Sequence, residues 1–294
     1  MTVSAPSMVG FERILVPTDF SDVSLRALEY AKCLARLNDA TILVAHASEA
    51  VNPVIPPEVI WYNQISGEQA DEERLHGLAA ELTSEGFHAG TAALAGSVQT
   101  EILALAEREN SDLIVMGTHG RSGLSRFFHG SETESLFRRA NCPILAVGPQ
   151  TGTADAAPWR PREILCACDF DPDSAPTVAY AHRLAQSFGA RLTILHVEDS
   201  EVHTSTEVKR MRFEFALTPL VSEGGEYTRP SYLSRVLMIG YNLGATIADV
   251  AVERQTDLIV IGAHGATPAQ THLPRGIAAQ VISKAPCPVM VLHR

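Results

Sequence analysis

The chain has 294 residues, a length that suits two domains better than one, and each half is long enough to bury a core of its own. Apolar residues make up 46% of the sequence and charged residues 19%, as in ordinary soluble globular proteins. The formal net charge of −11, with three lysines, argues against nucleic acid or an anionic membrane as the main partner. Because no apolar run reaches 18 residues, we expect no membrane span and place the protein in the cytoplasm.

Strand-like and helix-like segments alternate along the first half. Five short apolar runs predict strands, at 14–16, 41–47, 87–95, 113–117 and 143–147. Four segments between them predict helices, at 22–38, 66–85, 98–109 and 132–139, and the three prolines of 52–57 predict a loop. The strands are continuous apolar runs, which is typical of a parallel sheet. We therefore predict an α/β fold, a doubly wound five-stranded parallel sheet with helices on both faces.

The second half repeats the first. Arg13-ILVPTDFS-Asp22 is matched by Glu163-ILCACDFD-Pro172, and SDLIVMGTHG at 111–120 is matched by TDLIVIGAHG at 256–265. Strands are expected near 163–168, 191–197, 232–239, 257–262 and 288–292. Two copies are too few for a solenoid, so the repeat predicts two tandem domains of one fold. We place them at 1–150 and 162–294, with a linker of small residues and prolines at 151–161.

A glycine-rich loop follows the predicted strand at 113–117. It reads GTHGRSGLSRFFHGS from Gly117 to Ser131 and leads into a predicted helix. Glycines let backbone N–H groups approach a ligand, and a helix N-terminus adds unpaired donors and partial positive charge. The loop therefore predicts a phosphate site. Pro17-Thr18-Asp19 also follows a strand, and carboxyl ends of parallel strands share one edge of a sheet, so we expect both segments to face one crevice.

These motifs together resemble the universal stress protein family. The resemblance is carried by V-P-T-D-F-S near the start, a histidine ending the second strand, and G-x2-G-x9-G-[ST] before a final C-P-[IV] strand. It covers nearly the whole chain and implies a tandem member with two Rossmann-like domains. Family members that carry the glycine motif bind ATP, so the resemblance implies an ATP-binding regulatory protein of the stress response, with Mg²⁺ left open.

The resemblance also implies which residues contact the nucleotide. The first strand end would approach adenine and ribose, the end of the second strand would offer backbone contacts to the base, and the glycine motif would surround ribose and phosphates. Arg121 would neutralise phosphate charge. The implied residues are Pro17, Thr18, Asp19, Ala47, Met116, Gly117, Gly120, Arg121, Gly130 and Ser131. No catalytic residue and no metal site is assigned.

Several of these residues also have a structural explanation. Asp19 and Ser21 are residue types that cap helices, and Ser131 with Glu134 forms the S-x-x-E pattern of a capping box. Gly117 and Gly120 could serve only a tight turn. Two pairs of residues are expected to be structural: His46 and His196 as packed or hydrogen-bonded strand-end histidines, and Cys142 and Cys287 as buried core thiols.

The second copy departs from the motif. Arg275 stands at the position of Gly130, Gly276 at that of Ser131, and Cys168 at that of Thr18. A bulky side chain replaces backbone room, so we expect this half to bind ATP weakly or not at all. In the first half, Glu132 would repel phosphates unless it points away from them or meets a cation.

Two other functions are left open, a slow ATP hydrolase and a nucleotide-free interaction module. The first strand is not followed by an S-G-G-x-D-S loop, the chain has no P-loop, and neither His119 nor any other residue is identified as a general base, so we do not predict an enzyme. The last strand of each half is apolar and expected at a sheet edge, and similar proteins pair such edges between subunits. We expect the two halves to pair through these strands within one chain, and a homodimer is left open.

Overall fold

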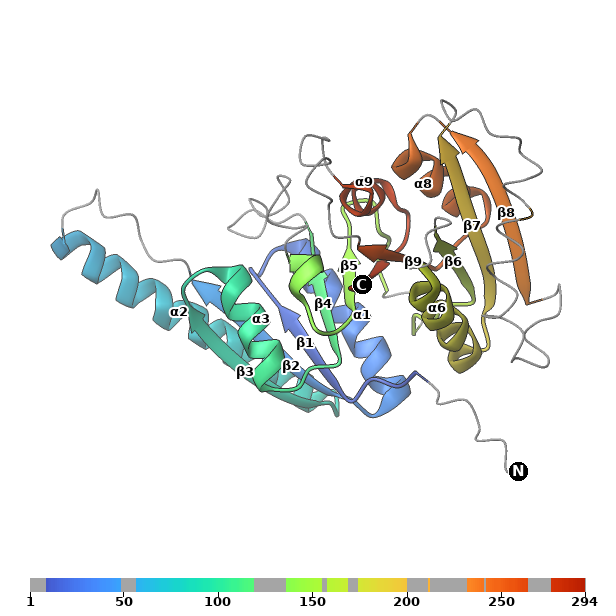
Figure 1. Ribbon diagram of the computed structural model, residues 1–294. Helices are drawn as coiled ribbons and strands as arrows, with labels where there is room; N and C mark the ends of the chain where they lie inside the picture. The colour runs from blue at the N-terminus through green and yellow to red at the C-terminus, as the bar shows by residue number, and fades with distance from the viewer. Residues whose placement is uncertain are drawn as a thin grey trace. The chain divides into compact units, whose positions relative to one another are not determined.

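The computed structural model describes residues 9–48, 57–118, 136–154, 158–168, 174–199, 211, 232–240, 242–263 and 276–293 (Figure 1). The chain forms two compact units. The N-terminal unit comprises Phe11–Val147 and Thr153–Pro158, and the C-terminal unit comprises Trp159–Arg294 together with Met1–Gly10 and Gly148–Gly152.

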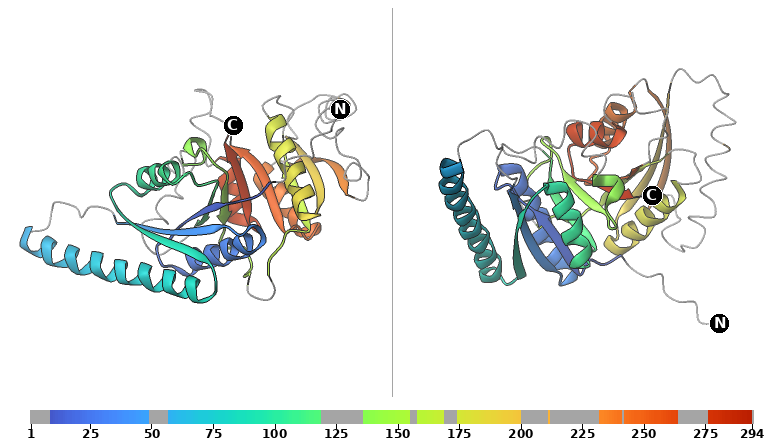
Figure 2. Two further views of the ribbon diagram at one scale, coloured as in Figure 1. Left: turned by 90° about the horizontal axis from the view of Figure 1, so that it is seen from below. Right: turned by 60° about the vertical axis from the view of Figure 1, so that its left-hand side comes forward.

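The N-terminal unit is built on a parallel sheet in the order β3-β2-β1-β4-β5. Its strands are β1 (Arg13–Pro17), β2 (Thr41–Ser48), β3 (His88–Ala95), β4 (Leu113–Gly117) and β5 (Ile144–Val147). Its helices are α1 (Asp22–Asn38), α2 (Pro57–Ser84) and α3 (Val98–Arg108), which lie on both faces of the sheet (Figures 1 and 2). The order in which successive strands are added reverses at β1, which pairs with β2 on one side and β4 on the other.

The C-terminal unit repeats this topology, in the order β10-β9-β6-β7-β8. Its strands are β6 (Glu163–Ala167), β7 (Arg191–Asp199), β8 (Leu233–Gly240), β9 (Leu258–Ala263) and β10 (Val289–His293). Its described helices are α6 (Ala175–Phe188), α8 (Leu243–Glu253) and α9 (Ile277–Lys284). The register repeats as well, because Arg13 pairs with Thr41 and Glu163 with Arg191, both 28 residues along the chain. The predicted pair of doubly wound parallel sheets is confirmed.

The cores follow directly from the apolar runs. Every residue of β4 is buried, as are four of the five residues of β1, because helices cover both faces of these central strands. Helix α1 begins after Ser21, whose side chain accepts a hydrogen bond from the Ser24 N–H group, and it ends at Asp39 in the left-handed conformation. The side chains of β3 are less buried, because this strand lies at the edge of its sheet.

Helix α2 differs from the prediction. It begins at Pro57, within the proline-rich stretch predicted as loop, rather than near residue 66. The first turn of a helix tolerates proline because its N–H group would have no partner there, so the proline marks the start of the helix. The backbone of the predicted helix at 132–139 is described only from residue 136, where it is helical as far as residue 139.

The segment after β5 packs closely within the C-terminal unit. The Gly148 N–H group donates to Thr151 Oγ1 at 3.1 Å, and Thr151, at the start of the predicted linker, is buried. A Cβ atom on Gly148 would lie 2.2 Å from the carbonyl oxygen of Ile282, so the chain approaches α9 at a distance that only glycine permits. Among the described residues, no helix combines the length and apolarity that a membrane span requires.

Candidate functional site

The turn after β1 is fixed by Thr18. The Thr18 N–H group donates to the Ala45 carbonyl at 2.8 Å, which extends the β1–β2 ladder one residue past the strand. The Thr18 hydroxyl oxygen accepts from the Phe20 N–H group at 3.0 Å and lies 3.1 Å from Ser24 Oγ. Thr18 is buried. One hydroxyl therefore ties the end of β1 to the first turn of α1.

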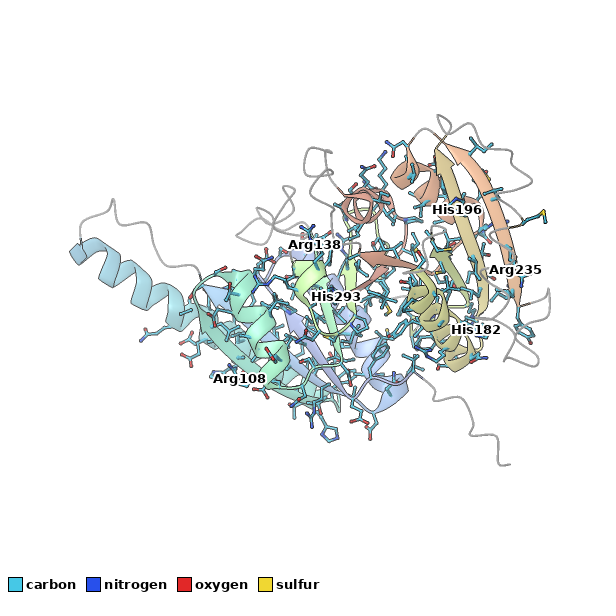
Figure 3. All side chains as sticks on the ribbon, in the orientation of Figure 1. Arg108, Arg138, His182, His196, Arg235 and His293 are labelled. Carbon is cyan, nitrogen blue, oxygen red and sulfur yellow. The ribbon has the colours of Figure 1, made fainter. Side chains whose placement is uncertain are left out.

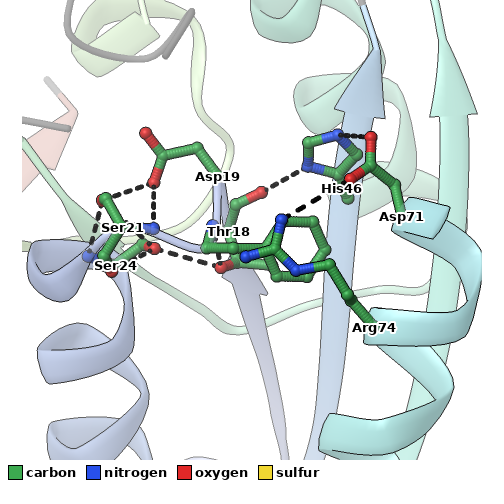
Figure 4. A network of polar contacts seen from close by, with 8 residues as sticks. Thr18, Asp19, Ser21, Ser24, His46, Asp71 and Arg74 are labelled. Atoms are coloured by element: carbon green, nitrogen blue, oxygen red, sulfur yellow. Dashed lines mark hydrogen bonds and ion pairs between the residues drawn. The ribbon is translucent and has the colours of Figure 1, made fainter. Parts of the chain in front are cut away.

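Asp19 stands at the rim of this turn and does not itself cap the helix. Its Oδ1 atom accepts from the N–H group of Ser21 at 3.1 Å and from the Ser21 hydroxyl at 2.5 Å. Ser21 Oγ in turn accepts from the Ser24 N–H group at 3.3 Å, so Ser21 is the cap and Asp19 orients it. Figure 4 shows one Asp19 oxygen directed at Ser21 and the other turned away from it. The contacts of Oδ1 with Ser21 thus orient the carboxylate at the carboxyl end of β1.

Phe20 holds an unusual backbone conformation in the same turn. Its φ angle is 59°, in the left-handed region that a bulky residue seldom adopts. The ring contacts two partners: the His46 ring, with centroids 4.9 Å apart, and the Arg74 guanidinium, whose Cζ atom lies 4.0 Å from the ring centroid. The strained residue is therefore stabilised from β2 and from α2.

His46 joins three elements at this edge of the sheet. Its Nδ1 atom lies 2.8 Å from the Thr18 carbonyl oxygen, and its Nε2 atom lies 3.3 Å from Asp71 Oδ2 on α2. Asp71 also lies near Arg74, with Oδ1 and Nη1 3.8 Å apart. The network of Figure 4 thus runs from β1 through β2 to α2. The prediction of a hydrogen-bonded strand-end histidine is confirmed for His46.

Gly117, at the end of β4, lies against the first turn of α1. A Cβ atom on it would lie 2.8 Å from the Ser24 backbone nitrogen and from the Val23 carbonyl oxygen. The neighbouring Thr118 is fully buried, and both its N–H group and its hydroxyl donate to the Val147 carbonyl, at 3.0 and 3.1 Å. The glycine is required for close packing of strand on helix, and this packing brings the end of β4 beside the Asp19 turn.

These features agree with the comparison to known proteins. The model of the universal stress protein family matches residues 10–148 and, a second time, residues 161–293. The chain belongs to the universal stress protein family. A universal stress protein of Methanocaldococcus jannaschii is 36% identical over 142 residues, which cover 47% of this chain and 82% of that protein.

Solved structures agree on the fold of this universal stress protein. One from Archaeoglobus fulgidus matches with a TM-score of 0.69 at 23% identity, covering 96% of both chains. A structure from Pseudomonas aeruginosa, a putative universal stress protein, matches with a TM-score of 0.63 at 21% identity and covers 96% of this chain and 93% of that one. At these sequence identities the comparison supports the fold alone.

The structure brings together the six implied site residues that it describes. They lie at or just past the carboxyl ends of β1, β2 and β4, and they are Pro17, Thr18, Asp19, Ala47, Met116 and Gly117. The phosphate part of the motif lies outside the described residues, as do two other positions that the sequence singled out; these are Gly120, Arg121, Gly130 and Ser131, with Glu132 and Glu134. The structure therefore describes only the strand-end side of the expected site.

Sequence reasoning missed Asp71 and Arg74. Neither belongs to a recognisable motif, and their importance arises because α2 packs against β2 and β3 and thereby places them beside His46 and Phe20. The one signal in the sequence was their i, i+3 spacing, which places opposite charges on one face of a helix. That spacing is common on solvated helix surfaces, so it could not single them out.

The C-terminal unit keeps the framework of this turn with different chemistry. The Cys168 N–H group donates to the Leu195 carbonyl at 2.9 Å. His196, labelled in Figure 3, has its Nδ1 atom 2.9 Å from the Cys168 carbonyl oxygen, which confirms the prediction for His196. A thiol stands where Thr18 provides a hydroxyl. Three further positions of this half lie outside the described residues: Asp169, His264 and Arg275. The N-cap of α9 is Gly276, which has no side chain to accept a capping hydrogen bond.

Cys142 and Cys287 are core thiols, as predicted. Burial raises the pKa of Cys142 to about 11 and that of Cys287 to about 12, and the neighbouring carboxylates of Asp112 and Asp257 act in the same direction. In the part of the chain that the structure describes, no group of three or more histidine, cysteine or acidic side chains could hold a metal ion. All five cysteines are free thiols.

Proposed function

We propose that this universal stress protein binds ATP in its N-terminal unit as a regulatory ligand, and that occupancy stabilises one conformation or assembly state. The observation that carries the proposal is the position of Asp19. Its carboxylate lies at the carboxyl end of β1, between β2 and β4, where the strand order of the sheet reverses. In open α/β sheets, ligands bind in the crevice at such reversals.

The chemistry of this turn suits the sugar and base of a nucleotide. An ionised carboxylate is an acceptor only, so Asp19 is matched to ribose hydroxyls or to an exocyclic amino group. Its second oxygen is turned away from Ser21 in Figure 4. The backbone of β2 near Ala47 lies on the neighbouring strand and offers contacts to the base. We assign the phosphates to the glycine motif from Gly117 to Ser131, with Arg121 balancing their charge and Mg²⁺ accompanying them.

We further propose that the C-terminal unit does not hold ATP. Its turn carries Cys168 in place of Thr18, and its loop has Arg275 and Gly276 in place of Gly130 and Ser131. From the sequence we expect a bulky side chain at the position of Gly130 to leave less room for a phosphate beside the backbone. A cytoplasmic location fits five cysteines that form no disulfide, because disulfides are rare in reducing compartments.

A matched pair of substitutions tests the proposal. Asp19→Ala removes the proposed ligand carboxylate, whereas Asp22→Ala removes an equal charge from an exposed position in the first turn of α1. Equilibrium dialysis with radiolabelled ATP should show binding by the native chain and by Asp22→Ala, with affinity lowered at least about tenfold in Asp19→Ala, the scale of losing a charged hydrogen bond. Equal affinities for both variants would contradict the assignment of Asp19, and steady ATP turnover would favour the hydrolase instead.

A further inference from the structure

One imidazole in the N-terminal unit faces two hydrogen-bond acceptors. His46 Nδ1 lies 2.8 Å from the Thr18 carbonyl oxygen, and Nε2 lies 3.3 Å from Asp71 Oδ2. A carbonyl and an ionised carboxylate accept hydrogen bonds and cannot donate them. The His46 ring lies between these two acceptors, so the contacts form one continuous chain from β1 to α2.

The Thr18 carbonyl belongs to the peptide group that leads into Asp19. A hydrogen bond to it fixes the plane of that peptide and hence the direction in which the Asp19 side chain leaves the strand. The peptide group before it is fixed because the Thr18 N–H group donates to the Ala45 carbonyl. The peptide group after it is fixed because the Phe20 N–H group donates to the Thr18 hydroxyl. The Thr18 carbonyl lies between these two fixed peptide groups, and His46 is its hydrogen-bond partner.

The same histidine also helps to hold Phe20 in its left-handed conformation. The Phe20 ring contacts the His46 ring on one side and the Arg74 guanidinium on another. Asp71 and Arg74 lie one helical turn apart on α2, so this helix contributes to the conformation of both residues that flank the Asp19 carboxylate.

After Asp71, further contacts hold helix α2 on the N-terminal unit. Its own residues Leu75 and Leu82 are buried, and Glu85, just after its end, accepts a hydrogen bond from Lys32 of α1 at 2.9 Å. A ligand that holds the Asp19 turn in one conformation therefore also favours the position of α2 that places Asp71 on His46. By linkage, the docked helix must strengthen binding by the same factor.

We infer that His46, held by Asp71, is a positioning residue for the nucleotide site, and that it links occupancy of this site to the docking of helix α2. The inference rests on the proposed nucleotide-binding function and names helix α2 as the element that responds to nucleotide binding. A ligand shifts an equilibrium only through different affinities for two states, and the His46–Asp71 contact provides the difference between docked and undocked α2.

The chain offers matched variants for a test on the intact protein. Asp71→Ala breaks the chain of contacts, whereas Asp71→Asn keeps an oxygen that can accept from Nε2. Glu72→Ala removes the same charge from an exposed neighbouring position on α2. His46→Ala removes both contacts, whereas His46→Asn keeps a donor near the position of Nδ1. His196→Ala removes the equivalent histidine of the C-terminal unit, which we propose not to bind ATP.

The affinity for ATP is measured by isothermal titration calorimetry, with urea unfolding of each variant to confirm that it is folded. We expect His46→Ala and Asp71→Ala to weaken binding by at least about fivefold, the lower range of measured coupling between sites. Asp71→Asn and His46→Asn should recover part of the loss, while Glu72→Ala and His196→Ala should bind like the native chain. A purely structural His46 would change the unfolding midpoint and leave the affinity of the folded protein unchanged.

Hydrogen exchange of residues 69–84 with and without ATP measures the link to α2. Exchange should slow on ATP binding in the native chain and change much less in Asp71→Ala. Native binding with unaltered exchange in α2, or equal affinity in native and Asp71→Ala chains, would overturn the inference and leave the proposed function standing. Failure of the native chain to bind ATP would overturn both.

Discussion

Gly117 and Ser24 are in closer contact than any other residue type at position 117 would allow. A Cβ atom on Gly117 would lie 2.8 Å from the Ser24 backbone nitrogen, and the Ser24 side chain is itself bonded within the turn that carries Asp19. The end of β4, the start of α1 and the Asp19 turn therefore form one tightly packed unit. A substitution in any one of these three segments should therefore alter the conformation or stability of the other two.

Gly117→Ala should destabilise the protein, because neither the α1 backbone nor β4 can move without disturbing buried hydrogen bonds. We expect a loss of about 1–3 kcal/mol in the free energy of unfolding, the usual cost of overpacking. Gly77→Ala is the matched control, since nothing lies within 4 Å of a Cβ atom there and alanine favours helix, so it should stabilise slightly. Urea unfolding measures both. A neutral Gly117→Ala would show that β4 and α1 adjust more freely than their packing indicates.

Thr18→Val should keep the shape of the β1 turn while removing its hydroxyl. The Phe20 N–H group and Ser24 Oγ each lose a partner in a buried environment, so we expect a cost of about 1–2 kcal/mol in stability. The affinity for ATP should fall as well, because Phe20 flanks Asp19. Denaturant unfolding and calorimetric titration of the same sample separate the two effects. An unchanged unfolding midpoint would mean that this hydroxyl does not organise the turn.

The thiols of Cys142 and Cys287 should be unreactive in the native protein. Their raised pKa values of about 11 and about 12 keep them protonated at pH 8, and only the thiolate is nucleophilic. After brief exposure to iodoacetamide at pH 8, mass spectrometry of peptides should show both unmodified, with half-buried Cys168 modified more readily. Denaturant should make all three reactive. Rapid native labelling of Cys142 or Cys287 would contradict their placement in the core.

The C-terminal unit should lose stability in mild acid because of His182. This side chain of α6 is 7% exposed, its Nε2 atom finds no hydrogen-bond partner among the described residues, and burial, with Arg183 acting in the same direction, lowers its pKa below 6.5 (Figure 3). Well above pH 6.5 the ring is neutral in both the native and unfolded states. Below it, the unfolded state takes up a proton that the native state resists, so the free energy of unfolding falls until the pH passes the native pKa.

The His182 prediction has a direct control. His182→Leu should flatten the dependence of unfolding on pH between 7 and 5, whereas His76→Leu, at an exposed position of α2, should leave it unchanged. Thermal unfolding across this pH range supplies the measurement. Identical pH profiles for native and His182→Leu chains would exclude the buried histidine as a cause of acid sensitivity.

The sequence predicted the strand framework well for a physical reason. Val16 and Val115 sit in continuous apolar runs that can be buried only between two helical layers, and the repeat supplied a second view of the same pattern. Ser21 could be identified as a helix cap but not separated from Asp19, since both residue types serve that role and only the hydrogen bonds distinguish them.

The contribution of α2 could not be predicted in the same way. Its start at Pro57 was read as loop because proline is compatible with both a loop and a first helical turn. The pairing of Asp71 with His46 depends on where the helix crosses the sheet, a relation between residues 25 positions apart that no local pattern encodes. Contacts of this kind appear only when the fold is known.

The stoichiometry of ATP binding tests the central claim most directly. Isothermal titration calorimetry of the intact, nucleotide-free chain should give one ATP per chain, and Asp19→Ala should abolish or strongly weaken that single site. Two equivalent sites would contradict the assignment of binding to the N-terminal unit alone. No binding at all would contradict the nucleotide-dependent function and favour an interaction module.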